Sequence, residues 1–423
     1  MTEWRDVRLG GLLQVKHGFA FRGKHFAKTG TLIVLTPGNF HERGGFKPKN
    51  GIEKYYDGPV PEGYLLPAGQ VVIAMTEQAA GLLGSSAVIP ADDVYLHNQR
   101  IGLLLVNPEA ASRRYVYYLF NSQEVRSQIA ASASGAKVRH TAPERIHDVR
   151  VRVPNLPVQH RIADVLTAFD ELIRNYRRKI EILEDAARSL YREWFVRYRF
   201  PGHGSAKVVE SSFGTIPDGW SVEPFSALGK YLNGFAFKPV HWQSEGVPII
   251  KIKELKNGVT PSTPRYPGDD IREKYRVVAG DLLFSWSGDL NAYLWAGPSG
   301  WLNQHLFRVS EGRGVPRSWL FLTLCDRMHE FRLRSQGTTM KHIQRSALDQ
   351  VHAIRPTAAV LSAFDERVSP FWDLLVDLRL QSAALLAARD LLLPKLVAGK
   401  IDVGALGVDD VFGWAELASI GDR

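Results

Sequence analysis

The chain has 423 residues, of which 45% are hydrophobic and 10% aromatic, and this composition predicts a globular protein of two to three domains and excludes a disordered one. Lys and Arg number 53 against 44 Asp and Glu, a formal charge of +9 that favours a polyanion partner over a membrane or a cationic substrate, unless the excess serves only solubility. The single cysteine excludes a disulfide framework and a thiolate zinc cluster, and with no signal pattern and no apolar run of ~20 residues it predicts a cytoplasmic protein.

Residues 1 to about 155 predict a module of mixed α/β structure. β-rich runs at 32–36, 71–75 and 101–106 are separated by Gly, Pro and Asn, which is typical of short strands joined by turns. We expect a helix over residues 115–133, because its apolar side chains fall on one side.

Residues 158–200 predict one long helix. Apolar side chains alternate in steps of four and three, Gly and Pro are absent, and the charged side chains lie outside this seam. At 1.5 Å per residue, a helix of ~40 residues is ~60 Å long. Pro201 and Gly202 then begin a linker. The expected seam consists of Val158, Ile162, Val165, Phe169, Leu172, Tyr176, Ile180, Leu183, Ala187, Leu190 and Trp194.

The chain after this linker repeats the first module. The tetrapeptide Gly-Phe-Ala-Phe at 18–21 recurs at 234–237, an offset of 216, and further matches continue to Asp170 and Asp365 with a smaller offset. A period this long indicates a duplicated domain and not a solenoid, whose repeats run ~20–50 residues. The second copy predicts strands at 247–252, 281–286 and 306–309, and a helix around 319–333, in the same order as the first.

A second apolar seam follows the second module. It runs through Leu361, Phe364, Val368, Phe371, Leu375, Leu378, Leu385, Leu392 and Leu396, with Ser382 and Arg389 also at seam positions. Ser369-Pro370 interrupts it, and could be an N-cap followed by Pro at the first helical position. Two long seams at equivalent places predict that the helices pair with each other, although each could be a surface helix of its own module.

These patterns predict an α+β chain in which two similar mixed α/β modules are joined by two long helices. The expected segments are a first module at 1–155, a helical spacer at 156–200, a linker at 201–211, a second module at 212–356, a second helical spacer at 357–400 and a tail at 401–423.

Motifs for catalysis on nucleotides or by activated nucleophiles are missing from the sequence. Residues 18–25 nearly match a phosphate-binding P-loop, but His25 stands where a Ser or Thr must bind magnesium, and the second copy loses the Gly-Lys pair. We therefore expect a turn that leads into a buried aromatic pair. The sequence also lacks Gly-x-Gly-x-x-Gly after a strand, the Asp/Asn-Pro-Pro-aromatic motif of amino-methyltransferases, His-Glu-x-x-His and Gly-x-Ser-x-Gly.

Basic and amide side chains near strand ends and loops suggest contacts to nucleic acid. Lys and Arg can follow phosphates, and amides and hydroxyls can read base edges. Each module also closes with a Gly-led turn that carries basic residues and a His, which would serve either as a phosphate clamp or only as a domain-closing turn. The DNA-binding candidates are Arg43, Lys47, Lys49, Thr76, Gln78, Lys137, Arg139 and His140 in the first copy, and Lys251, Lys253, Lys256, Ser285, Trp286, Ser287, Thr338, Thr339, Lys341 and His342 in the second.

Three motifs resemble a known family. Residues 154–163 (PNLPVQHRIA) lead into the first long helix, residues 216–220 (IPDGW) open the second module, and residues 389–396 (RDLLLPKL) with 399–401 (GKI) end the second helix. Together with the duplication, they resemble the specificity subunit of type I restriction-modification systems over essentially the whole chain. The second helix departs from the family pattern, because residues 357–360 lack the Pro-x-x-x-Gln lead-in of the first.

The resemblance implies two target-recognition domains that each read one half of a split sequence in double-stranded DNA. It implies that the helices pair antiparallel as an intrachain coiled-coil spacer, with pseudo-two-fold symmetry, and dock modification subunits, two of them in our expectation. S-adenosylmethionine, ATP and Mg are expected on the modification and restriction subunits, and no cofactor, metal or catalytic residue in this chain. The rival interpretations are a stand-alone DNA methyltransferase, which the missing motifs oppose, and a coiled-coil DNA-binding scaffold without base readout.

Overall fold

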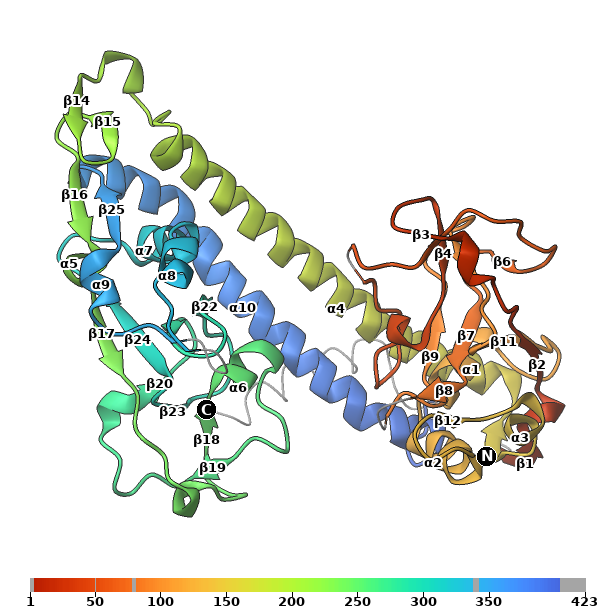
Figure 1. The fold of residues 1–423 in the computed structure, drawn as a ribbon. Helices are drawn as coiled ribbons and strands as arrows, with labels where there is room; N and C mark the ends of the chain where they lie inside the picture. The colour runs from red at the N-terminus through yellow and green to blue at the C-terminus, as the bar shows by residue number, and fades with distance from the viewer. Residues whose placement is uncertain (1–3, 50, 78–80, 338–341, 404–423) are drawn as a thin grey trace. The chain divides into compact units, whose positions relative to one another are not determined.

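The computed structural model describes residues 4–49, 51–77, 81–337 and 342–403 (Figure 1). Its contacts divide the chain into two units. Unit 1 consists of residues 1–171 and 386–418, and unit 2 of residues 172–385 and 419–423. Both long helices therefore contribute one part of their length to each unit. In the described residues, no helix is both long and apolar enough to cross a membrane.

Unit 1 is built on two sheets, one of four strands and one of five. The four-stranded sheet has the order β2-β11-β7-β9, the five-stranded sheet the order β3-β5-β4-β10-β6, and β1 pairs with β13 and β8 with β12. The strands are β1 (Trp4–Arg8), β2 (Leu13–His17), β3 (Phe26–Ala27), β4 (Leu32–Val34), β5 (Tyr55–Tyr56), β6 (Leu65–Leu66), β7 (Val71–Ala74), β8 (Thr76–Glu77), β9 (Ser86–Val88), β10 (Tyr95–Leu96), β11 (Ile101–Val106), β12 (Arg139–His140) and β13 (Arg150–Pro154), and the short helices are α1 (Arg113–Phe120), α2 (Gln123–Ser132) and α3 (Pro143–His147).

Unit 2 repeats this topology. The sheets have the orders β17-β24-β21-β22 and β19-β18-β23-β20, β16 pairs with β25, and a hairpin of β14 and β15 comes before them. The strands are β14 (Val208–Ser211), β15 (Gly214–Pro217), β16 (Ser221–Pro224), β17 (Gly229–Asn233), β18 (Val247–Ile250), β19 (Arg265–Tyr266), β20 (Arg276–Val277), β21 (Leu282–Ser285), β22 (Asn291–Leu294), β23 (Gly300–Leu302), β24 (Leu306–Glu311) and β25 (His352–Arg355), and the helices are α5 (Phe225–Leu228), α6 (Ile252–Asn257), α7 (Arg317–Asp326), α8 (Met328–Leu333) and α9 (Ala347–Gln350). The predicted duplication and α+β class are confirmed.

The repeated Gly-Phe-Ala-Phe segment forms the expected turn. A Cβ atom on Gly18 would lie 1.9 Å from the carbonyl oxygen of Asn98, and one on Gly234 2.2 Å from that of Asn303, so only glycine fits at either position. In each copy the two Phe rings meet edge to face, with centroids 5.2 Å apart in unit 1 and 5.1 Å in unit 2. The segment therefore locks two strands together by backbone approach and aromatic packing.

The two long helices are α4 (Leu156–Tyr191) and α10 (Ala358–Val397). None of the eleven predicted seam residues of α4 and its last turn is exposed, and eight of the nine apolar seam residues of α10 are fully buried. The seam of α4 also includes Gln159, Ala163, Leu166 and Ile173, which the periodicity did not select. The apolar repeat therefore identified the buried face of both helices.

Within each unit the two helices contact each other. In unit 1 Arg389, near the end of α10, donates to Asp170 on α4 at 2.6 Å. In unit 2 Phe364, near the start of α10, packs edge to face on Trp194 and Phe195 just after α4, with centroids 5.7 and 4.8 Å away. The start of one helix thus lies beside the end of the other in both units, which is the antiparallel pairing that the resemblance implied.

Four predicted boundaries were wrong. The first long helix ends at Tyr191 and closes with a π-helical turn at Arg192–Val196, before residue 200. The linker expected at 201–211 already contains β14, which pairs with β15. The helices expected at 115–133 and 319–333 are each two helices, because Asn121 and Ser122 break the first, with Ser122 capping α2, and Arg327 breaks the second.

Pro370 does not interrupt the second helix, contrary to the prediction. α10 is continuous from Ala358 to Val397 although a proline inside a helix removes one hydrogen bond and costs ~3 kcal/mol. Val368 and Trp372, on either side of it, are buried in the core of unit 2. This packing holds the helical path where the local sequence would end it.

Candidate nucleic-acid interface

The basic loop of unit 1 lies between β4 and β5 and carries Arg43, Lys47 and Lys49. Lys47 is exposed, whereas Arg43 donates to Asp390 of α10 at 2.9 Å. The Lys49 ammonium donates to the Thr36 hydroxyl at 2.7 Å. Burial, helped by the nearby charge of Lys54, lowers the pKa of Lys49. Lys47 is therefore exposed without such a contact, whereas Arg43 and Lys49 form hydrogen bonds within the protein.

The candidates at the end of β7 and in the Gly-led turn come together in one strand pair. β8 and β12 are antiparallel, with Thr76 opposite His140 and Glu77 opposite Arg139. The His140 ring is 3.1 Å from the Ser134 hydroxyl, and Arg139 donates to Glu77 at 3.1 Å. Lys137 is exposed at the turn, whereas Gln78 lies outside the described residues. Candidates that are 62 and 64 positions apart in the sequence therefore come together in unit 1.

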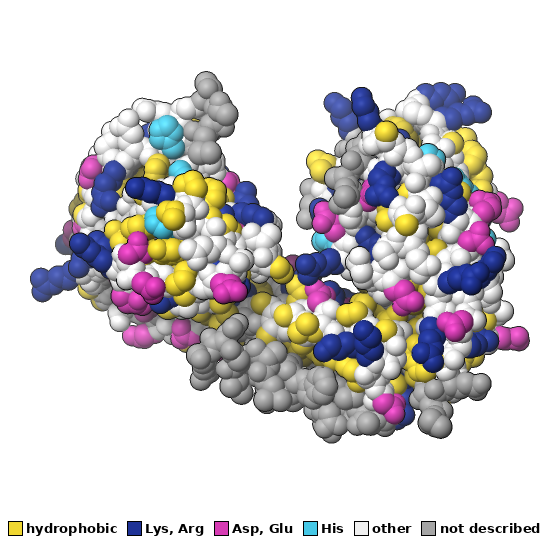
Figure 2. Space-filling model, turned by 90° about the horizontal axis from the view of Figure 1, so that it is seen from below, with side chains coloured by type: hydrophobic (Ala, Val, Ile, Leu, Met, Phe, Trp, Pro, Cys, Tyr) yellow, Lys and Arg dark blue, Asp and Glu magenta, His cyan; other side chains and the backbone are white. Residues whose placement is uncertain are grey.

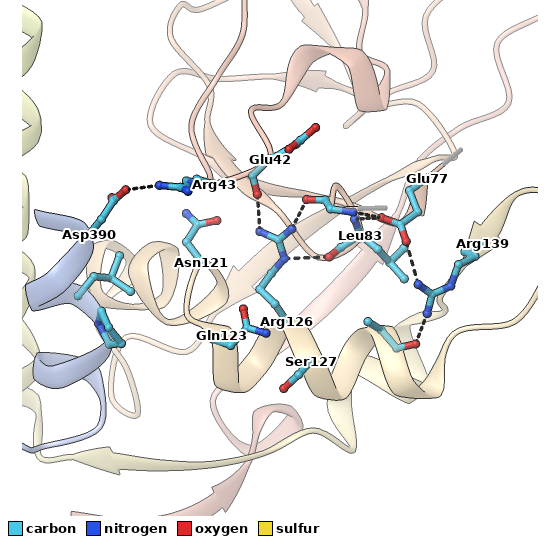
Figure 3. A pocket seen from close by; sticks show the side chains of 14 residues that line it. Glu42, Arg43, Glu77, Leu83, Asn121, Gln123, Arg126, Ser127, Arg139 and Asp390 are labelled. Carbon is cyan, nitrogen blue, oxygen red and sulfur yellow. Dashed lines mark hydrogen bonds and ion pairs between the residues drawn. The ribbon is translucent and has the colours of Figure 1, made fainter. Parts of the chain in front are cut away.

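A frame of two charged side chains holds the loops around this strand pair (Figure 3). The Glu77 carboxylate is buried, and its Oε2 accepts hydrogen bonds from the backbone N–H groups of Gly81, Leu82 and Leu83 at 2.9–3.0 Å. Arg126 on α2 donates to the backbone carbonyls of Leu83 and Glu42, each at 2.9 Å, and to that of Gly81. We call Glu77 and Arg126 the loop frame, because together they join the loop at 41–45 to residues 81–83.

The loop frame borders a cavity of about 540 Å³ in unit 1. Arg43, Asn121, Gln123, Ser127 and Asp390 line it, and most of their polar groups already bond to the protein: Arg43 to Asp390, Asn121 to the backbone at Tyr117 and Ser86, and Ser127 to the carbonyl of Glu124. The cavity is therefore a space between framework elements, and its lining does not present a set of free groups for a small ligand.

The basic candidates of unit 2 gather around α6. Lys251 is the N-cap residue of α6, and its backbone N–H donates to Glu254 at 3.2 Å. Lys253 is exposed and donates to the Ser262 hydroxyl at 3.2 Å, whereas Lys256 forms an ion pair with Asp289 at 2.7 Å. Among the described residues, Lys251 and Lys253 form no ion pair with an acidic side chain, whereas Asp289 balances the charge of Lys256.

The strand-end candidates of unit 2 divide into exposed and buried groups. The Ser285 side chain is fully buried and its hydroxyl donates to the Ser287 carbonyl at 3.0 Å, and Ser287 is itself 2% exposed. We therefore assign these two serines to the support of the strand end. Trp286 is half-buried, and its indole N–H donates to Asn233 at 3.2 Å. His342 pairs with Ser287 and Gln336 as bridge partners, whereas Thr338, Thr339 and Lys341 lie outside the described residues.

The loop frame was not predicted from the sequence. Glu77 lies between the candidates Thr76 and Gln78 in the sequence, but nothing local marks its carboxylate as buried, and Arg126 is one of many arginines on helices. In unit 2, Arg332 on α8 has a related role, because it donates to the carbonyl of Leu290 at 3.1 Å. The visible face of each unit carries Lys and Arg at many separate points (Figure 2). Among the described residues, no cluster of His, Cys, Asp and Glu could hold a metal ion.

Two copies of one α+β module, both on a basic chain and each followed by a long helix, define a class of duplicated recognition proteins. Residues 1–184 match the family model of the type I restriction modification DNA specificity domain. The type I restriction enzyme MjaIX specificity subunit of Methanocaldococcus jannaschii is 23% identical over 312 residues, which cover 71% of this chain and 72% of that protein. The type I restriction enzyme HindI specificity subunit of Haemophilus influenzae is 19% identical, with coverages of 73% and 82%.

The fold has a counterpart among solved structures. The S subunit of a type I restriction-modification system from M. genitalium superposes with a TM-score of 0.60 at 13% identity, and the alignment covers 93% of this chain and 96% of that one. The chain is thus similar to type I restriction-modification specificity subunits, in its first 184 residues by the family model and over most of its length by these relatives. The resemblance found in the sequence is thereby confirmed.

Proposed function

We propose that this chain recognises a split target in double-stranded DNA, with one module for each half of the target. It is a non-catalytic specificity subunit, as its family members are. The observation that carries the proposal is the repetition of the whole module, down to the strand pair at its polar end. Two copies whose side chains differ at equivalent positions, such as Met75 and Trp286, suit the reading of two different half-sequences.

Each module would combine phosphate and base contacts. Exposed lysines such as Lys47, Lys137 and Lys253 suit phosphates, because a flexible ammonium binds as a point charge. Thr76 and the half-buried Trp286, together with the loops beside them, suit the base edges at the polar end of the sheet. The loop frame would keep the loops of unit 1 in one shape, which makes readout of a fixed sequence less costly in entropy.

The two long helices would hold the readers apart and dock the other subunits. We propose two modification subunits, which bind S-adenosylmethionine, and restriction subunits that use ATP and Mg, while this chain binds none of these groups. The sole cysteine, Cys325, is a half-buried free thiol, which suits work in the cytoplasm beside the DNA.

The test is a selection of random duplexes by the purified chain assembled with its modification subunits. The proposal expects enrichment of two short fixed sequences separated by a gap of constant length. Enrichment without a consensus would indicate a scaffold that binds DNA without base readout. Methyl transfer by the purified chain alone would indicate a stand-alone methyltransferase, and either result would contradict the proposal.

A further inference from the structure

Few large aromatic side chains are exposed in the described residues, and two of them occupy equivalent places in the duplicated modules. Only three Phe or Trp side chains count as exposed there: Phe26 at 42%, Trp242 at 56% and Phe213 at 38%. Exposing an aromatic ring forgoes the free energy that its burial would provide. An exposed ring that occurs twice, once in each copy, therefore points to a partner that meets both modules.

The equivalence of Phe26 and Trp242 follows from their neighbours. Each comes directly after a histidine, and each histidine ring packs edge to face on a tyrosine: His25 on Tyr56, with centroids 5.7 Å apart, and His241 on Tyr266, with centroids 5.0 Å apart. The chain then continues as the edge partner of the tyrosine strand in both units, through the pairing of β3 with β5 and the bridge between Gln243 and Arg265.

A lysine lies over each of these rings. The Lys54 ammonium is 5.5 Å from the centroid of Phe26, and that of Lys251 is 5.9 Å from the centroid of Trp242. The two lysines come from different elements, since Lys54 precedes β5 whereas Lys251 follows β18. The lysine therefore comes from a different position of the fold in each module, but both modules place an ammonium group over an exposed aromatic ring.

The surroundings of both rings are basic. Arg22, Lys24 and Lys28 are exposed in the residues around Phe26, and Lys238 and Lys253 are exposed in those around Trp242 and Lys251. Lys54 lies close enough to Lys49 to contribute to the lowered pKa of that candidate. Acidic side chains also lie nearby: Glu53, whose carboxylate accepts from the backbone of Lys49 and Gly51, Asp57, which lies 3.6 Å from His25, the exposed Glu245, and Asp269 and Asp270 close to Tyr266.

We propose that Phe26 and Trp242 are sequence-independent DNA contacts, one for each half-site. The ring packs on a deoxyribose or wedges against a base step of the duplex, and the lysine beside it binds the adjacent phosphate. Aromatic rings and ammonium groups together favour nucleic acid over a protein partner, because a duplex offers apolar sugars and base steps directly beside its phosphates. This inference rests on the proposed function, and it adds a contact that is the same in both modules although their reading residues differ.

The experiment measures binding of the full-length chain, assembled with its modification subunits, to a duplex that carries the selected target and to one that does not. For Phe26→Ala and Trp242→Ala we expect affinity for both duplexes to fall about tenfold, with the ratio of the two affinities unchanged. Phe26→Trp and Trp242→Phe keep an aromatic face and should restore binding. Lys54→Gln and Lys251→Gln should each make the salt dependence shallower by about one unit.

The matched control is Phe213→Ala. Phe213 is the third exposed ring and has the Arg327 guanidinium 5.5 Å from its centroid, but it lies in the turn of the β14–β15 hairpin and occurs in one unit only. This variant should bind like the unmodified chain.

Three outcomes would overturn the inference. Unchanged DNA affinity of Phe26→Ala and Trp242→Ala contradicts it while the proposed function stands. Loss of binding to the modification subunits, with the DNA affinity of the chain intact, would assign the rings to a protein interface. A change in the ratio of target to non-target affinity would make them base-reading groups. Failure of the unmodified chain to bind DNA would instead refute the proposed function.

Discussion

At the scale of single residues, the sequence indicates where polar side chains accumulate but not which of them are already used by the fold. Arg139 was selected as a phosphate contact, yet it donates to Glu77, 62 positions earlier in the chain. Ser285 was selected as a base contact, yet its side chain is fully buried. The exposure of Lys47, Lys137 and Lys253 agrees with their selection. Pairing and burial depend on long-range register, which no local pattern specifies.

The loop frame gives a prediction about selectivity. Arg126→Lys keeps a positive charge but loses the fork that bonds three carbonyls. We expect the salt dependence of DNA binding to stay the same, while discrimination at the half-site read by unit 1 relaxes about tenfold and the other half-site is unaffected. Binding measured on duplexes with single base changes in each half-site checks this. Equal relaxation at both half-sites, or none at either, would show that Arg126 does not act through these loops.

Glu77→Gln tests the other half of the frame. A glutamine has one acceptor oxygen and an NH₂ group, so it cannot accept both from Arg139 and from the three backbone N–H groups that Glu77 serves. We expect the same relaxation at the half-site of unit 1, together with a free energy of unfolding that is about 1–3 kcal/mol lower. Thermal unfolding and the same set of duplexes measure the two effects separately.

His97 gives a prediction about pH. Its ring is fully buried, Nε2 lies 2.8 Å from the carbonyl of Ile101, and Nδ1 has no partner among the described residues. Burial, with smaller effects of the charges of Lys16 and His17, lowers the pKa of His97 to about 4. The unfolded chain takes up a proton near pH 6.5 whereas the folded chain does not, so stability is lost as the pH falls from 6.5 towards 4.

Because of His97, the free energy of unfolding at pH 5 is about 2 kcal/mol lower than at pH 7.5. His97→Gln removes the titrating group, and the pH dependence of its unfolding should therefore be weaker by that amount. Denaturant unfolding of both proteins at the two pH values measures the difference. Identical pH dependence would mean that His97 accepts a proton in the folded chain.

At the scale of elements, apolar periodicity was the reliable signal. It identified the strand at Ile101–Val106 and the buried faces of both long helices, because burial of one face is what selects the pattern. Residues that locally favour a helix end were a less reliable signal: some did not end a helix, and some helix ends were not predicted. Ser369-Pro370 did not end α10, whereas Asn121-Ser122 and Arg327 did divide the shorter helices. Tertiary packing decides whether a weak local signal becomes a boundary.

If the two long helices set the distance between the modules, lengthening one of them should change the gap between the two half-sites. Four residues inserted after Lys179 advance the helix by ~6 Å and leave a net rotation of about 40°. Residues 174–186 contain no fully buried side chain, so the insertion should be tolerated there. We expect the gap between half-sites to lengthen by one or two base pairs with both half-sequences unchanged, as read from methylation of the host genome.

The same four residues inserted after Ala206, outside α4 and before β14, are the control and should leave the gap unchanged. If the complex with the helical insertion stays intact and the gap between half-sites is unchanged, the partner subunits and not the helices set the spacing. Phe169→Asp instead places a charge at a position that is 2% exposed, and we expect it to destabilise unit 1 by several kcal/mol and to weaken subunit assembly.

At the scale of the whole molecule, the duplication and the charge were visible in the sequence. The repeat fixed the order of elements in both modules, and the family resemblance supplied the antiparallel helix pair. The excess of basic residues predicts DNA binding that weakens steeply with salt: if ~6 phosphates are neutralised, the slope of log affinity against log salt is about −5. A slope near zero in a binding titration would contradict an electrostatic contact to DNA.

The measurement that tests the central claim most directly is an exchange of one module. Residues 212–356 would be replaced by the equivalent segment of another family member, and the methylated motif of the host genome would be read for both chains with the same modification subunits. We predict a split motif in which one half changes and the other half stays identical. A continuous motif, or a change in both halves after exchange of one module, would contradict the account of two modules that read DNA independently.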